Sequence, residues 1–285
     1  MNAPDFAWLP LKAKYGLANS DEDIASNIEA TLKTEYRGFQ ELIEAKKGAV
    51  SVVGSGTSLK ANWHKLKDFD GDIVACNAAC QFLLERGITP QYMFCFDADK
   101  LVMEFFEKPH KDVTYIISSR CVPQVFEALK GFKVIVIHTG GDLHLEELLL
   151  KYGKNEPMFI GGSAAVTRGM TVVAAMGYNP IHLWGVDGSF AGEDTHIGQS
   201  TTVERRTKIM MNKRVFDVAP WMTRQVDDFK MLAPPLKAWG IRLIVHGDGL
   251  IPYLAETLGY ETDLPAYKRI YGKVKNTTQL FWNAL

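Results

Sequence analysis

The sequence lacks an excess of charge of either sign. Its 32 Lys and Arg residues are balanced by 33 Asp and Glu residues, which gives a formal net charge of −1 at pH 7. A protein held to nucleic acid by bulk charge needs a basic surface excess, because its affinity comes from neutralised phosphates. We therefore expect no nucleic-acid partner, although a local basic patch is compatible with this composition.

Long apolar runs and paired cysteines are also lacking. No apolar run approaches the roughly 18 residues that cross a bilayer, and the first residues show no basic stretch leading into an apolar one. Cys76, Cys80, Cys95 and Cys121 show no CxxC spacing, and three of them lie in or beside apolar runs. These absences argue against a zinc or disulfide site and favour a cytoplasmic protein with reduced thiols and no integral membrane association.

The sequence does contain a repeated alternation of apolar runs and helix-length stretches. Runs rich in Val, Ile and Phe cover residues 50–53, 73–76, 92–96, 114–117, 133–137, 181–184 and 242–245. This alternation predicts an α/β fold, a Rossmann-like and mostly parallel sheet with helices on both faces. Ligands bind beyond the carboxyl ends of the strands in such sheets, so the residues that follow each run form the candidate site.

Three additions accompany this α/β domain, which we place at 48–263. Residues 1–47 are predicted as an N-terminal helical extension, with a helix that starts after Asn19 or Ser20. A polar, basic and aromatic insertion at about 188–232 is interpreted as a helical lid or as a solvated excursion. Residues 264–285 are predicted as a C-terminal tail that docks on the domain or forms a homo-oligomer contact.

A glycine-rich turn follows the first run. Glycines let the backbone approach a phosphate, and hydroxyl groups and a helix N-terminus add donors. The third glycine of a dinucleotide fingerprint is replaced by Leu59, and no acidic residue follows the second run, so a nicotinamide or flavin dehydrogenase is disfavoured. The predicted nucleotide-binding residues of this turn are Gly54, Ser55, Gly56, Thr57 and Ser58.

Polar residues follow the second and third runs. The amide of Asn77 is interpreted as a helix cap or as a contact to a base or ribose, with capping favoured as its single role. Asp97 and Asp99 form a pair that can hold a divalent ion such as Mg²⁺ between substrate phosphates. Asp97 is the stronger candidate, because Asp99 is also placed to cap the next helix.

Two later segments complete the candidate site. Gly161, Gly162 and Ser163 precede the helix predicted at 164–176 and indicate either a second phosphate or carboxylate nest or a tight helix entrance. Asp187 follows the run at 181–184 and is predicted, with Asp97 and His196, to be catalytic. His196 lies in a polar stretch without apolar periodicity and is interpreted as a general base or phosphate partner, or as a surface histidine.

The order of these motifs resembles the MptE-like domain family. The resemblance rests on the segments 52–59, 73–77 and 90–97, and then on 161–163, 177–181, 185–187 and 195–196, in order over about residues 20–255. The family takes its name from an archaeal 6-hydroxymethyl-7,8-dihydropterin diphosphokinase and includes the motility-associated-factor glycosyltransferases. The same order is more distantly similar to bacterial sialyltransferases that use a CMP-sugar.

The resemblance implies a nucleotide-dependent transferase. By position, the turn at 54–58 would contact the phosphate side of the nucleotide, Asn77 would contact the nucleotide, and His196 would be the base. Asp97 stands where the sialyltransferases have an amide. Their paired tyrosines have no counterpart here, so sialyl transfer itself is not implied.

Three functions stay open at this stage. A glycosyltransferase would bind a nucleotide-activated sugar at the glycine turn and a small-molecule or glycan acceptor at the insertion. A diphosphokinase would move pyrophosphate from ATP to a pterin alcohol with Mg²⁺. A catalytically inactive nucleotide-binding module would keep the fold alone. The long insertion favours an acceptor larger than a pterin, and hence the glycosyltransferase.

Overall fold

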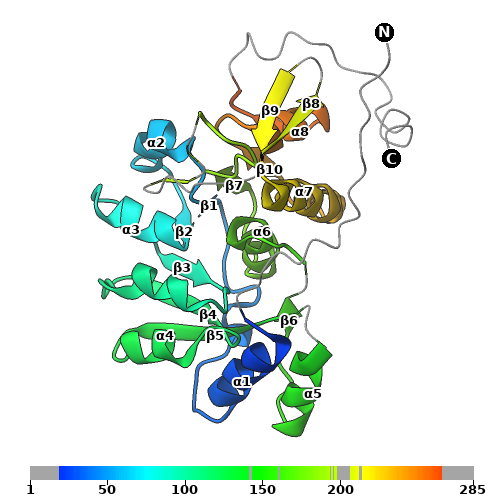
Figure 1. The fold of residues 1–285 in the computed structure, drawn as a ribbon. Helices are drawn as coiled ribbons and strands as arrows, with labels where there is room; N and C mark the ends of the chain where they lie inside the picture. The colour runs from blue at the N-terminus through cyan, green and yellow to red at the C-terminus, as the bar shows by residue number, and fades with distance from the viewer. Residues whose placement is uncertain are drawn as a thin grey trace, which may run out of the picture.

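A computed structural model describes residues 19–140, 143–159, 161–192, 194, 196–197, 206–211 and 214–264. Its centre is a nine-stranded sheet in which every pair of neighbouring strands is parallel (Figure 1). The strands are β1 (Val50–Val53), β2 (Asp72–Cys76), β3 (Tyr92–Cys95), β4 (Thr114–Ser118), β5 (Lys133–Thr139), β6 (Met158–Phe159), β7 (Ile181–Trp184), β10 (Leu243–Val245) and β11 (Glu261–Thr262). The predicted parallel α/β fold is confirmed.

The strand order creates a switch point beside β1. The order is β11-β10-β7-β1-β2-β3-β4-β5-β6, so the chain extends the sheet from β1 to β6 and then returns to the other side of β1 with β7. Connections leaving β1 and β7 therefore diverge at the carboxyl end of the sheet. A crevice at this position is where open parallel sheets bind ligands.

Helices cover both faces of the sheet, as the continuous apolarity of the strands requires. Val52 packs into one apolar cluster and its neighbour Val53 into the other, because successive side chains point to opposite faces. One face carries α2 (Leu59–Asn62), η2 (Trp63–Leu66), α3 (Ala78–Leu84), η3 (Lys100–Phe106) and α4 (Pro123–Ala128). The other carries η1 (Phe39–Leu42), α6 (Ala165–Ala175), α7 (Pro220–Ala238) and α8 (Leu250–Thr257).

Between residues 19 and 47, the part of the N-terminal extension that the structure describes, the chain forms two short helical elements, α1 and η1. Helix α1 (Asp21–Leu32) starts after Ser20, whose hydroxyl accepts from the backbone N–H of Asp23 at 3.1 Å while the Asp23 carboxylate accepts from the Ser20 N–H. Ile24 and Ile28 of α1 share a third apolar cluster with Leu145 of α5 (Leu143–Lys151). Figure 1 shows α1 beside α5 at the β5–β6 end of the sheet.

The insertion differs from the predicted helical lid. The first strands or helices in its described part form an antiparallel hairpin, β8 (Thr207–Met211) and β9 (Arg214–Val218), and α7 follows. Residues of β9 alternate between buried and exposed, as in a strand with one face on the core. Phe216 and Val218 are buried, whereas Val215 is 54% exposed. Helix α7 also runs past the predicted end at 232, to Ala238.

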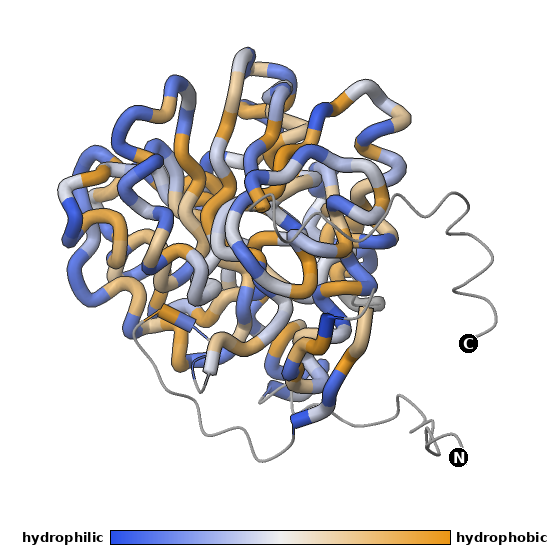
Figure 2. Tube along the Cα trace, turned by 90° about the horizontal axis from the view of Figure 1, so that it is seen from above, coloured by the Kyte–Doolittle hydropathy of each residue, from blue (hydrophilic) through white to orange (hydrophobic). Residues whose placement is uncertain are grey.

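The remaining predicted strand ends lie within two residues of the observed ones. β6 and β11 were not predicted, because two residues are too short to show a pattern. Figure 2 shows apolar segments running through the body and hydrophilic ones at many outer turns. Within the described ranges, no helix combines the length and apolar character needed to cross a membrane. Residues 1–18 and 265–285 lie outside the described part, so neither end can be compared with its prediction.

Candidate active site

A cavity of about 250 Å³ lies at the switch point. The carboxyl ends of β1, β2, β3 and β7 form its floor, and the starts of α6 and α7 form its walls. Its lining includes Gly54, Ser55, Gly56, Cys76, Asn77, Phe96, Asp97, Ser163, Ala164, Asp187, Ser189, His196, Trp221, Met222 and Gln225. All three predicted catalytic residues, Asp97, Asp187 and His196, are thus brought together in one cavity.

The glycine turn is attached to the neighbouring strand by every second amide. The N–H of Gly54 donates to Trp184 at 2.8 Å, and the N–H of Gly56 donates to Gly185 at 2.8 Å. A side chain at Gly56 would place Cβ 2.6 Å from the Gly185 oxygen, so glycine is required there. The intervening amides, those of Ser55 and Thr57, donate no hydrogen bond to any residue that the structure describes.

Asp187 holds this turn in place. Its buried carboxylate accepts from the Ser58 N–H at 2.7 Å, from the Ser58 hydroxyl at 2.5 Å and from the Thr57 hydroxyl at 3.0 Å. Burial raises the pKa of Asp187 to about 6, although the hydrogen bonds from Ser58 and Thr57 oppose that rise. The hydroxyls predicted to bind a nucleotide therefore bind Asp187, and neither Thr57 nor Ser58 lines the cavity.

Asn77 departs from its predicted capping role. It occupies the N-cap position of α3 with φ of +51°, but its side chain makes no capping hydrogen bond. Its Oδ1 atom is buried without a hydrogen-bond partner in the described part of the chain, and the residue lines the cavity. An unsatisfied buried acceptor costs about 1–3 kcal/mol. A ligand that donates a hydrogen bond to this oxygen would remove that cost.

The two aspartates after β3 have separate places. Asp97 is exposed and lines the cavity, where its Oδ1 accepts from the N–H of Asp99 at 3.1 Å. Asp99 accepts from the N–H of Leu101 at 2.9 Å and caps η3, as its alternative interpretation predicted. It does not line the cavity. Among the described residues, no three His, Cys, Asp or Glu side chains are grouped to hold a metal ion.

The turn before α6 is occupied by a carboxylate of the chain itself. The N–H of Ser163 and its hydroxyl both donate to Oδ2 of Asp228 on α7, each at 2.5 Å. Ser163 lines the cavity, whereas Gly161 and Gly162 do not. The carboxylate nest predicted for this turn thus binds Asp228, which fixes α7 to the start of α6.

His196 stacks on Trp221, an aromatic residue of the insertion. The rings of His196 and Trp221 are 5.3 Å apart between centroids and 12° from parallel. Burial lowers the pKa of His196 below its ordinary value, which favours the neutral imidazole. The next residue, Ile197, donates its N–H to the Ser55 oxygen at 2.8 Å. His196 is therefore held beside the glycine turn.

Phe96 forms another wall that the motifs did not indicate. The guanidinium carbon of Arg168 lies 4.2 Å from the Phe96 ring centroid. Arg168 is buried and donates to the carbonyl oxygens of Gly162 at 2.8 Å and Gly140 at 3.3 Å. Its guanidinium supports the aromatic wall from behind. A positional signal in the sequence could have identified the lining residues that the motifs missed. Phe96 directly follows a strand, and Trp221 and Gln225 lie near the start of a helix.

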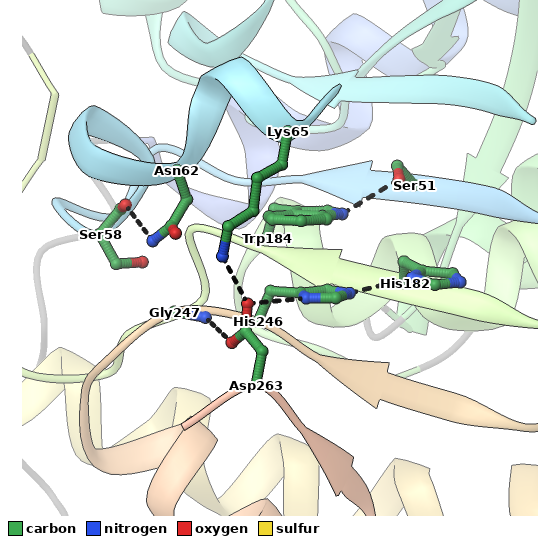
Figure 3. Close-up of polar contacts among 9 residues, drawn as sticks. All are labelled: Ser51, Ser58, Asn62, Lys65, His182, Trp184, His246, Gly247 and Asp263. Atoms are coloured by element: carbon green, nitrogen blue, oxygen red, sulfur yellow. Dashed lines mark hydrogen bonds and ion pairs between the residues drawn. The ribbon is translucent and has the colours of Figure 1, made fainter. Parts of the chain in front are cut away.

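A second histidine cluster lies outside the cavity (Figure 3). His246 stacks on Trp184 at 3.7 Å between ring centroids, and its Nδ1 lies 3.1 Å from Asp263 while its Nε2 lies 2.9 Å from Nδ1 of His182. Lys65 of η2 donates to Asp263 at 3.0 Å. We call Lys65, His182, His246 and Asp263 the histidine clamp. It ties η2, which follows the glycine turn, to the ends of β10 and β11.

Comparison with known proteins identifies a family and a solved structure with a similar fold. Residues 22–193 match the family described as 6-hydroxymethylpterin diphosphokinase MptE-like. The MAf glycosyltransferase from Magnetospirillum magneticum AMB-1 superposes with a TM-score of 0.65 at 17% identity, over 90% of this chain and 39% of that one. The chain therefore spans well under half the length of that glycosyltransferase, and the likeness establishes the fold.

Two further comparisons add no argument. A mammalian sialyltransferase in complex with Gal-beta-1-3GalNAc-ortho-nitrophenol has a TM-score of 0.39 and 12% identity, over 79% of each chain. That similarity is too low to support a conclusion about this protein. No curated protein matches the sequence.

Proposed function

This chain belongs to the MptE-like family, and from that premise we propose that it is a glycosyltransferase that uses a nucleotide-activated sugar. One observation carries the proposal. The cavity at the switch point is lined by Ser55 of the glycine turn, whose N–H donates to no described residue, by an amide oxygen that has no described partner, and by a histidine whose pKa is lowered by burial. The N–H of Thr57, in the same turn, likewise donates to no described residue. These are groups suited to a phosphate, a nucleoside and an acceptor hydroxyl, in that order.

The donor would bind along the ends of β1 and β2. The N–H groups of Ser55 and Thr57 are the proposed donors to the phosphate of the nucleotide, and the start of α2 reinforces them. Oδ1 of Asn77 would accept from an amino or hydroxyl group of the nucleoside. Asp187 does not act on the substrate in this scheme, because it already accepts three hydrogen bonds from the turn.

The transfer step assigns His196 as the general base. The imidazole takes the proton of the acceptor hydroxyl while the acceptor oxygen forms a bond to the anomeric carbon of the sugar. The bond from that carbon to the nucleotide phosphate breaks, and its electron pair leaves on the phosphate oxygen. The amides of Ser55 and Thr57 stabilise the added negative charge, and the proton on His196 later passes to solvent.

A magnesium ion brought by a diphosphate donor would take one carboxylate ligand from this chain. That ligand is Asp97, since the carboxylate of Asp99 already caps η3. Magnesium commonly uses one or two carboxylates together with substrate phosphates and water. The ion would neutralise phosphate charge as the bond to the leaving group breaks.

A pterin diphosphokinase is the second candidate, and the description of the family supports it. The ring of Phe96, backed by Arg168, offers a wall for a flat heterocycle. The first residues of α7 favour the glycosyltransferase instead. Trp221 and Gln225 line the cavity together with His196, and their indole and amide groups would offer contacts to an acceptor larger than a pterin.

Thermal-shift and turnover measurements separate these candidates. The full chain is screened against CMP, UDP, GDP and ATP and their sugar conjugates, with and without Mg²⁺. We expect a nucleotide sugar to raise Tm and to be hydrolysed slowly or transferred, and Asn77→Leu to weaken that shift. Release of AMP from ATP with hydroxymethyldihydropterin, without turnover of any nucleotide sugar, would instead establish the diphosphokinase. Absence of any activity with binding retained would indicate a nucleotide-binding module.

A further inference from the structure

Trp221 covers one face of the proposed base. Its ring lies nearly parallel to the His196 imidazole, 12° between planes and 5.3 Å between centroids. Both residues line the cavity, but they come from segments 25 positions apart in the sequence, before and after the β8–β9 hairpin. No motif pairs them. Their stacking is a product of the fold alone.

The position of Trp221 is fixed from behind. Trp221 lies in the first turn of α7, directly after Pro220 at the helix start. Two turns later the same helix is joined to the α6 turn by Asp228, which is buried and accepts from Ser163. The tryptophan is thus presented by a helix that the hydrogen bonds from Ser163 to the buried Asp228 fix against the start of α6. A ring on such a support has little freedom to leave the imidazole.

We propose that Trp221 is a positioning residue that stabilises the imidazolium form of His196, the cation produced when His196 takes a proton from the acceptor. The proposal rests on the proposed function for its catalytic meaning. Its physical content, a coupling between the indole face and the charge of the imidazole, can be measured without any substrate.

The neutral and the protonated forms of His196 interact differently with the indole face of Trp221. The face of a tryptophan carries negative electrostatic potential and attracts a cation within about 6 Å of the ring centroid. A neutral imidazole gains only stacking, whereas an imidazolium gains this attraction as well. The stabilisation therefore grows as the proton arrives, so it lowers the barrier to the transfer step more than it strengthens ground-state binding.

The charged groups that the structure describes near the cavity have places of their own. Asp187, at the end of β7, is held by the glycine turn, and Asp97 is exposed after β3. Asp194, two residues before His196, pairs with Lys60 of α2 at 2.7 Å. Burial is what lowers the pKa of His196. Trp221 is the group whose π face opposes that effect of burial.

In the proposed step the proton leaves the acceptor oxygen for a ring nitrogen of His196. The acceptor oxygen then bonds to the anomeric carbon, and the carbon–phosphate oxygen bond breaks with its electrons on the phosphate. Trp221 forms no bond in this sequence. It remains stacked while the imidazole gains one positive charge, and that charge is lost again when the proton passes to water.

The test is an NMR titration of the His196 ring in three tryptophan variants of the full chain. Trp221→Leu keeps an apolar cover and removes the π face, Trp221→Phe keeps a weaker π face, and Trp239→Leu is the matched control. Trp239 is 77% exposed at the other end of α7. We expect the pKa of His196 to fall by about 0.5 to 1 unit in Trp221→Leu, by less in Trp221→Phe and not at all in Trp239→Leu.

Turnover provides the second measurement. In Trp221→Leu the acid limb of the pH–rate profile should move to lower pH by the same amount as the pKa of His196 measured by NMR. The value of kcat at the plateau should fall about three- to tenfold. A pKa of His196 that is unchanged or raised in Trp221→Leu overturns the proposal. If the pKa falls as expected while the wild-type chain transfers no sugar, the coupling stands and the proposed function fails.

Discussion

Two of the histidines that the structure describes stack on tryptophans, and their surroundings differ. The ring centroids of His246 and Trp184 are 3.7 Å apart, and the two ring nitrogens of His246 face Asp263 and His182. The ring centroids of His196 and Trp221 are 5.3 Å apart, and His196 lines the cavity. The first ring has its nitrogens committed to other side chains within the clamp. The second is placed where an acceptor could reach it.

The comparison teaches how one ring pair can serve two purposes. In the histidine clamp the stack is joined to a carboxylate: Lys65 and His246 both contact Asp263, which also accepts from the Gly247 N–H at 2.8 Å. Burial acts to raise the pKa of Asp263, but these hydrogen bonds lower it well below its ordinary value. The clamp therefore contributes to stability near neutral pH, and the His196 stack to the proposed chemistry.

The largest effect should come from removing the cavity histidine. His196→Asn keeps a polar side chain of similar reach but cannot accept and hold the proton. We expect kcat to fall by about 10²- to 10⁴-fold, with a change in Tm of less than about 2 °C because the side chain lies at the cavity and asparagine fills part of its volume. Turnover assays and thermal unfolding measure the two quantities. Full activity in His196→Asn would remove it as the base.

Replacing Asp187 should lower both the stability of the fold and the affinity for the nucleotide, because its carboxylate holds the glycine turn. Asp187→Asn replaces one acceptor oxygen by a donor that faces the donors of Thr57 and Ser58. We expect the free energy of unfolding to fall by about 1–3 kcal/mol, and the Kd for the nucleotide to rise about tenfold. Denaturant unfolding and calorimetric titration test this. Unchanged nucleotide affinity would show that the turn does not bind the phosphate.

Breaking the clamp should leave catalysis largely intact. Asp263→Asn removes the charge that faces Lys65 and His246. Because these groups are only partly buried, we expect a loss of about 1–2 kcal/mol in the free energy of unfolding at pH 7. The value of kcat should change less than about threefold. A loss of activity as large as that of His196→Asn would mean that the two stacks are one functional unit.

The smallest effect concerns the pH dependence of stability. Burial, with His246 and Arg242 nearby, lowers the pKa of His182 to about 4, below its ordinary value. The unfolded chain therefore binds more protons at this residue, so His182 makes stability fall as the pH drops from about 6.5 towards 4. In His182→Asn the fall in Tm over this range should be shallower. A curve parallel to that of the wild type would exclude His182 as a contributor.

The fold could be predicted from the sequence because its strands are short, apolar on both faces and separated by helix-length segments. Asn77 and Asp97 could be placed in the candidate site for the same reason, since both follow strands. Asn77 was nonetheless assigned a capping role, because its φ of +51° cannot be read from residue type. The hairpin was missed because its polar residues hid the period-two pattern of β9.

Partners distant in the sequence account for most of what could not be predicted. Ser163 is 65 residues from Asp228, and Thr57 is 130 residues from Asp187. Each carboxylate takes up donors that would otherwise suit a ligand. Short motifs identify which groups can bind an anion. Only the packing of α7 on α6, and of β7 on β1, determines whether the chain already supplies that anion.

The central claim is that the glycine turn and Asn77 bind a nucleotide at the switch point and that the clamp does not. Amide chemical shifts measured while CMP, UDP or a matching sugar nucleotide is added test this most directly. We predict large shifts for the N–H groups of Ser55 and Thr57 and for the Asn77 side chain, with little change at Gly247 beside the clamp. Shifts that occur at Gly247 while Ser55, Thr57 and Asn77 stay constant would contradict the account.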